Sequence, residues 1–160
     1  MQQQTAILVD DMPQALEMLA NDISNNHPNI SIIGKANSVV SAAKLLRATQ
    51  PDILFLDIML GDGTGFDLLE IIPDLKSKII FVTASDAFAI RAFKFAAIDY
   101  ILKPYSDKEL NIAIEKALHQ IQPKNEQLSV LQESISSPNL APKKISLHTL
   151  DKIIVVALDE

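Results

Sequence analysis

The sequence predicts an α/β fold, a doubly wound parallel sheet of five strands with helices on both faces. Three observations predict it. Short apolar runs alternate five times with segments of helical periodicity. The runs are continuous, as in strands that helices cover on both faces. Right-handed crossovers leave a doubly wound sheet, in which the order 2-1-3-4-5 would bring strands 1, 3 and 4 together.

The five predicted strands are short runs in which Ile, Leu and Val predominate. Such side chains pack well on a pleated surface, and a strand buried on both faces needs no polar alternation. In chain order, the strands cover residues 6–9, 30–34, 53–56, 79–82 and 98–102.

The predicted helices begin at residues with capping character. Pro13 suits the first turn of the first helix, and Ser38 can cap the second. Pro73 stops the third, the fourth covers residues 87–96, and the fifth begins at the capping box 106–109. Apolar residues recur at helical spacing: Met12, Leu16, Leu19 and Ile23; then Val39, Ala42, Leu45 and Leu46; then Phe66, Leu69 and Ile72; and finally Leu110, Ile114, Ala117, Leu118 and Ile121.

The composition is that of an acidic globular protein. The chain has 160 residues, of which 48% are hydrophobic and 21% charged. A net charge of −6 argues against this piece binding a nucleic-acid backbone, and the lack of cysteine excludes disulfides and thiolate metal sites. We find no signal peptide and no apolar run of membrane length, so we expect a cytoplasmic protein without a membrane partner.

The composition changes after the fifth helix. Residues 1–121 form the predicted first domain, and residues 122–142, with several Pro and Ser, form a predicted linker. Two apolar strands follow at 145–149 and 153–157, and a lone hairpin cannot bury such residues by itself. We therefore interpret 143–160 as the first strands of a truncated second domain. The alternative is a hairpin that packs back on the first domain.

Polar side chains follow four of the predicted strands: Asp10 and Asp11, Asp57, Thr83 and Lys103. The carboxyl ends of parallel strands share one edge, where α/β proteins place ligands, so we expect these side chains to converge. Clustered carboxylates repel one another without a cation, and oxygen ligands beside phosphate suit Mg²⁺. Asp57 could then be a nucleophile that forms an acyl phosphate, with Lys103 and Thr83 bonding phosphoryl oxygens.

Two other kinds of site use the same region. The glycines of 61–65 are spaced somewhat like a glycine-rich dinucleotide-binding motif. That motif belongs after the first strand, however, and Asp57 would repel a pyrophosphate. A haloacid-dehalogenase-like phosphatase also uses an aspartyl nucleophile, but it needs a second Asp where Met59 stands. Three histidines lack ligand spacing and are interpreted as surface residues: His27, His119 and His148.

Together, these strand-end residues carry a resemblance to a known family. Asp10-Asp11, Asp57, Thr83-Ala84 and Lys103-Pro104 resemble the signature positions of the receiver domain of bacterial two-component response regulators. The resemblance covers residues 5–121 and implies a flavodoxin-like sheet of order 2-1-3-4-5. It also implies that Asp57 accepts a phosphoryl group from a sensor histidine kinase. Asp10, Asp11, Asp57 and the Met59 backbone carbonyl are the Mg²⁺ ligands that the resemblance implies.

The same resemblance implies a switch. Thr83 and Tyr100 would be the residues that rearrange, and Lys103 would pair with the phosphoryl group, with a cis peptide before Pro104. A receiver accepts one phosphoryl group and holds it. We therefore expect a signalling protein and not an enzyme that turns over a metabolite.

The chain departs from the receiver pattern at two places. Gly61 stands where many receivers have proline. Met59 and Ser85 occupy positions that help govern dephosphorylation in the family, and neither carries an acid or amide that would orient a water molecule. We hypothesise slow self-dephosphorylation.

Longer segments indicate a subfamily. Residues 61–69 and 89–104 resemble receivers of the LytR/AlgR type, and residues 144–160 resemble the opening strands of a LytTR DNA-binding domain. DNA would then be bound only by the domain of which this chain contains the first strands. The alternative is a stand-alone receiver that acts through protein–protein contacts.

The fourth predicted helix is unusually aromatic. Phe88, Ile90, Phe93 and Phe95 span too wide an arc for one buried face. Core packing accounts for some of them, and an exposed apolar side would serve pairing. Because receivers commonly dimerise through the fourth helix, fifth strand and fifth helix, we predict a homodimer there, favoured by phosphorylation.

Overall fold

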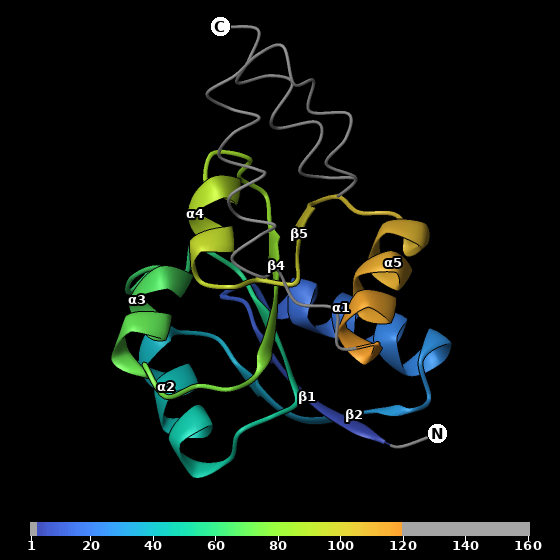
Figure 1. Cartoon of the computed structure of the whole chain (residues 1–160), viewed down its shortest axis with the longest axis horizontal. Helices are drawn as coiled ribbons and strands as arrows, with labels where there is room; N and C mark the ends of the chain where they lie inside the picture. Colours follow the sequence, from blue (N-terminus) through green and yellow to red (C-terminus); the bar gives the residue numbers. More distant parts are fainter. Residues whose placement is uncertain (1–2, 120–160) are drawn as a thin grey trace, which may run out of the picture.

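A five-stranded parallel sheet lies at the centre of the computed structural model, which describes residues 3–119 (Figure 1). The strand order is β2-β1-β3-β4-β5, which confirms the predicted order. The strands are β1 (Gln4–Val9), β2 (Ile30–Ala36), β3 (Ile53–Leu56), β4 (Lys78–Thr83) and β5 (Asp99–Leu102).

Within residues 3–119, five helices alternate with the strands, because parallel neighbouring strands need a crossover connection, usually a helix. They are α1 (Pro13–Asn26), α2 (Val39–Ala48), α3 (Gly65–Ile71), α4 (Ala89–Lys94) and α5 (Asp107–Leu118). Helices α1 and α5 lie on one face of the sheet, and α2, α3 and α4 lie on the other (Figure 1). Within residues 3–119, no helix has the length and apolar character that crossing a membrane requires.

Strand β3 shows why the apolar runs are continuous. Ile53 and Phe55 belong to the core beneath α1 and α5, whereas Leu54 and Leu56 belong to the core beneath α2, α3 and α4. All four side chains are at most 1% exposed. Full burial of one such side chain contributes about 1.5–3 kcal/mol, so both cores hold this strand in place.

The strand register sets the edge at which the polar residues emerge. Val9 pairs with Leu56, and Leu56 pairs with Phe81. The next residue of β1 and of β3 is an acid, Asp10 or Asp57, and the amide of Asp57 donates to the Val9 carbonyl at 2.9 Å. The carboxyl ends of the central strands therefore lie level with one another.

Helix caps follow the sequence closely. Ser38 caps α2 and Ser106 caps α5, each in a capping box. A third box, Thr64 with Asp67, begins α3 and was not predicted. The prediction that Met12 belongs to the first apolar stripe is wrong, because Met12 precedes α1 and is 56% exposed.

Two further expectations need correction. His27 is not a surface residue: it is 7% exposed, and its Nε2 lies 2.7 Å from Asn111 Oδ1 of α5. The fourth helix is shorter than 87–96. Of the four large apolar residues in the predicted span, Phe93 is buried and the others are half-buried: Phe88, Ile90 and Phe95. The predicted linker and hairpin, and His148, lie outside the described residues.

Candidate functional site

Three carboxylates meet at the carboxyl edge of the sheet. Asp10, Asp11 and Asp57 each place one carboxylate oxygen within 4.8 Å of the others. Asp10 and Asp57 are buried, and Asp11 is exposed. Asp10 follows β1, and its Oδ1 accepts the amide of Met12 at 2.9 Å. The turn into α1 thus fixes the orientation of the Asp10 carboxylate.

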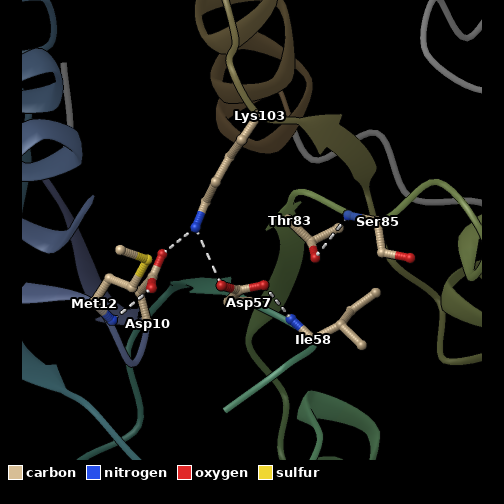
Figure 2. Close-up of polar contacts among 7 residues, drawn as sticks. All are labelled: Asp10, Met12, Asp57, Ile58, Thr83, Ser85 and Lys103. Atoms are coloured by element: carbon tan, nitrogen blue, oxygen red, sulfur yellow. Dashed lines mark hydrogen bonds and ion pairs between the residues drawn. The ribbon is translucent and has the colours of Figure 1, made fainter. Parts of the chain in front are cut away.

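Lys103 brings the positive charge to this cluster. It follows β5, and its ammonium group forms ion pairs with Asp10 and with Asp57 Oδ2, the latter at 3.1 Å (Figure 2). Burial lowers the pKa of Lys103, but the hydrogen bond to Asp10 and the charges of both carboxylates outweigh burial, and the net pKa is raised. Lys103 is therefore a full cation in contact with two acids. The peptide between Lys103 and Pro104 is cis, as predicted.

Asp57 lies in the middle of this group of polar side chains (Figure 2). Its Oδ1 accepts the amide of Ile58 at 2.7 Å, and its Oδ2 accepts from Lys103 (Figure 2). Burial raises the pKa of Asp57, and Lys103 and the hydroxyl of Thr83 offset only part of this rise. A carboxylate that is held rigidly and is poorly solvated is well placed to bond an electrophile.

Thr83 and Tyr100 are linked through one backbone segment. Thr83 ends β4 and is 1% exposed, and its hydroxyl oxygen accepts the Ser85 amide at 3.4 Å (Figure 2). Tyr100 is fully buried, and its hydroxyl donates to the Ser85 carbonyl. Its ring lies 6.1 Å from that of Phe81, centroid to centroid. The backbone of Ser85 thus contacts both predicted switch residues, Thr83 through its amide and Tyr100 through its carbonyl.

The carboxylate set fits a hard divalent cation. Negatively charged oxygens are the ligands that Mg²⁺ favours, and here they come from Asp10, Asp11 and Asp57. The backbone of Met59 follows two residues after Asp57, in a short loop whose isolated bridge pairs Met59 with Thr64.

Sequence reasoning missed the role of Gly65. A Cβ on this residue would lie 2.6 Å from the carbonyl oxygen of Asp57, closer than real contacts allow. Its amide donates to the Ile58 carbonyl at 2.7 Å. Gly65, interpreted from the sequence only as part of the glycine-rich segment 61–65, is the first residue of α3 and packs against the candidate phospho-acceptor. The missed signal is a glycine directly before the apolar stripe of α3.

Two more polar contacts hold the site's elements together. The Tyr105 hydroxyl donates to Asp22 Oδ2 at 3.1 Å, which ties the loop after β5 to α1. Asp99, at the start of β5, pairs with Lys116 of α5 at 3.1 Å. Neither pair lies at a sequence spacing that patterns could reveal.

Comparison with known families decides how to interpret this edge. The family model described as the response regulator receiver domain matches residues 6–115. The chain belongs to the response regulator receiver family. The fold agrees: the receiver chain from a Klebsiella pneumoniae response regulator, the response regulatory domain of protein mrkE, superimposes with a TM-score of 0.67 at 31% identity, covering 72% of this chain and 96% of that one.

Curated relatives of this receiver are signalling proteins. Sensory transduction protein LytT of Enterococcus faecalis is 35% identical over 156 residues, which is 96% of this chain and 62% of that protein. Sensory transduction protein LytR of Staphylococcus haemolyticus is 40% identical over 125 residues, or 75% of this chain and 47% of that protein. The chain therefore spans less than two thirds of the length of these relatives.

Proposed function

We propose that this receiver accepts a phosphoryl group from a sensor histidine kinase on Asp57. The observation that carries the proposal is the position of the Asp57 carboxylate: it is buried at the sheet edge, in contact with Lys103 and within 4.8 Å of Asp10 and Asp11. This arrangement supplies a nucleophile, a cation for the phosphoryl oxygens and further carboxylates for a metal.

The transfer is a displacement at phosphorus. A carboxylate oxygen of Asp57 forms a bond to phosphorus while the bond from phosphorus to the kinase histidine nitrogen breaks, and the histidine leaves with the electron pair. Bound Mg²⁺, held by Asp10, Asp11, Asp57 and the Met59 carbonyl, would offset negative charge on the phosphoryl group. The Lys103 ammonium is placed to bond a phosphoryl oxygen, because it already donates to Asp57 Oδ2 at 3.1 Å.

The switch would follow as a population shift. A phosphoryl group on Asp57 offers new acceptor oxygens to the Thr83 hydroxyl, which now accepts from the Ser85 amide at 3.4 Å. Movement of Thr83 would release or reshape the Ser85 segment, and the Ser85 carbonyl accepts from Tyr100. Phosphorylation would thereby reach β5 and α4.

Output control is the less direct part of the proposal. The alignment with LytT covers 96% of this chain and so continues beyond residue 119, which supports a region shared with LytT after the receiver. We propose a cytoplasmic regulator whose receivers pair through α4, β5 and α5 and whose following domain binds DNA.

Phosphorylation is tested by intact mass. The chain is incubated with acetyl phosphate and MgCl₂, and we expect a gain equal to one phosphoryl group that Asp57→Asn abolishes. Asp52→Asn is the matched control, because Asp52 precedes β3 at the opposite edge of the sheet and its carboxylate accepts hydrogen bonds from the amide and hydroxyl of Thr5. Continuous release of phosphate without a stable adduct would show a phosphatase and contradict the proposal.

A further inference from the structure

The loop between β3 and α3 is a small ladder with Asp57 at its base. The amide of Gly65 donates to the Ile58 carbonyl at 2.7 Å, and the amide of Leu60 donates to the Gly63 carbonyl at 3.0 Å. Between these two rungs, Met59 and Thr64 form an antiparallel bridge. The segment that carries the Met59 carbonyl is therefore one hydrogen-bonded unit.

Asp62 lies in the turn at the end of this ladder and accepts hydrogen bonds from helix α2. Its Oδ1 accepts the amide of Val39 at 2.8 Å, and its Oδ2 accepts the amide of Val40 at 3.2 Å. These are the first two amides of α2, which have no partner within the helix. Ser38, the cap of α2, serves the next amide, that of Ser41, at 3.0 Å.

The contact with α2 favours the ionised form of the Asp62 carboxyl group. The hydrogen bond from Val39 has the largest effect and lowers the pKa of Asp62. Burial opposes it, the bond from Val40 adds to it, and the net pKa is lowered. A carboxylate at a helix N-terminus is also favoured by the helix dipole. Asp62 is thus an anion at neutral pH that uses both oxygens on α2.

The glycines on either side let the tip reach α2. Gly61 has φ +81°, a conformation closed to proline, whose φ is held near −65°. A Cβ on Gly63 would lie 3.2 Å from Val39 Cγ2 and 3.0 Å from Asp67 Oδ2, so the backbone itself packs close to α2. The departure from proline at residue 61 has a physical reason: the loop turns Asp62 toward α2.

We propose that Asp62 is a positioning residue for the metal and phospho-acceptor site. By tying the ladder to α2, it keeps the Met59 carbonyl where a divalent cation can bind beside Asp57. This role rests on the proposed function, because the position of the Met59 carbonyl matters only if a cation binds there.

The test compares Asp62→Ala with Asp62→Asn, which keeps one acceptor oxygen. Mg²⁺ affinity is measured by calorimetry or NMR titration of the full chain without any phosphodonor. We expect Asp62→Ala to weaken Mg²⁺ binding by about tenfold, the low end of the usual cost of losing a group that supports a metal ligand. Asp62→Asn should lie between Asp62→Ala and the parent.

Amide hydrogen exchange reports directly on the two hydrogen bonds from α2 to Asp62, which we call the clamp. In Asp62→Ala, the Val39 and Val40 amides should exchange faster, while the Ser41 amide, bonded to Ser38 Oγ, should not change. Asp52→Asn is the control for loss of an exposed carboxylate that bonds backbone, since Asp52 Oδ2 accepts the Thr5 amide at 2.8 Å. It should leave Mg²⁺ affinity unchanged.

Salt separates positioning from simple loss of negative charge. In about 1 M KCl the screening length is about 3 Å, so a remote charge effect would vanish. We expect the deficit of Asp62→Ala to persist there. Affinity equal to the parent, a deficit lost in high salt, or the same deficit in Asp52→Asn would each overturn the clamp alone. Failure of the parent chain itself to bind Mg²⁺ would overturn the proposed metal site and the clamp with it.

Discussion

The hydroxyl of Tyr100 donates a hydrogen bond to the backbone carbonyl of Ser85, 15 residues earlier in the chain. The backbone amide of Ser85 donates to the hydroxyl oxygen of Thr83 at 3.4 Å. A side chain of β5 and the last residue of β4 therefore meet on one peptide segment, next to the site at Asp57. In the proposed switch, this relationship is the route from the site to the face proposed for pairing.

Tyr100→Phe tests that coupling. Losing the phenol hydroxyl leaves the Ser85 carbonyl without this donor, and we expect a loss of about 1 kcal/mol in the free energy of unfolding, the usual net value of one hydrogen bond. Urea unfolding measures the loss. Sedimentation with beryllofluoride, compared with Tyr105→Phe as the control, should show weaker pairing only for Tyr100→Phe, and equal pairing in both would contradict the coupling.

Alkaline pH should destabilise the fold through both tyrosines. Burial raises the pKa of Tyr100 to about 12, and burial with the bond to Asp22 raises the pKa of Tyr105. An unfolded tyrosine ionises near pH ~10. Above that pH the unfolded state loses protons that the folded state keeps, so the free energy of unfolding falls as pH rises.

The chain's two Tyr and lack of Trp make this measurable by tyrosinate absorbance. We expect little absorbance change near pH ~10 while the protein is folded, because both phenol pKa values are raised. A full step at that pH, with circular dichroism unchanged, would contradict the raised pKa values of buried Tyr100 and half-buried Tyr105.

Lys103→Ala should affect metal binding and phosphorylation in opposite directions. The Lys103 ammonium bonds Asp10 and Asp57, so it competes with a cation for the same carboxylates. Its removal should tighten Mg²⁺ binding and, because a phosphoryl oxygen loses its partner, slow phosphorylation by acetyl phosphate. Titration calorimetry and intact mass measure the two effects, and a parallel fall in both would refute the competition.

Gly65→Ala should damage the site more than Gly61→Ala. A methyl group at residue 65 would meet the Asp57 carbonyl at 2.6 Å, and overpacking of this kind costs about 1–3 kcal/mol. At residue 61 nothing lies within 4 Å, and the penalty comes only from the positive φ, about 1–2 kcal/mol. We expect only Gly65→Ala to slow phosphorylation at temperatures where both variants are folded.

The acyl phosphate on Asp57 should be long-lived. Met59, with its side chain 56% exposed, has no group that orients a water molecule. Met59→Asn adds an amide beside the site and should shorten the half-life of the phosphorylated chain, followed by intact mass after removal of the phosphodonor. A parent half-life of seconds, unchanged in Met59→Asn, would count against slow self-dephosphorylation.

Much of this fold could be predicted from sequence, for a specific reason. Strand β3 is apolar at every position because both of its faces are buried, so its identity and its end at Asp57 are visible in the sequence. Caps such as Ser38 and Ser106 are equally local, since each bonds an amide three residues ahead. The length of the fourth helix was overestimated, because Phe88 and Phe95 lie just outside the helix and still pack against the core.

By itself, the sequence determined the parallel α/β architecture and the edge at which Asp10, Asp57 and Lys103 emerge, because these follow from local patterns of apolar residues and turns. The strand order came from the resemblance to receivers, and the structure confirms it. Tertiary structure alone decided the contacts that adjust that edge. The inward position of Tyr100 and the hold of Asp62 on α2 join residues 15 and 22 positions apart, and no periodicity encodes such pairs. They depend on backbone geometry that exists only once the sheet and its helices have packed.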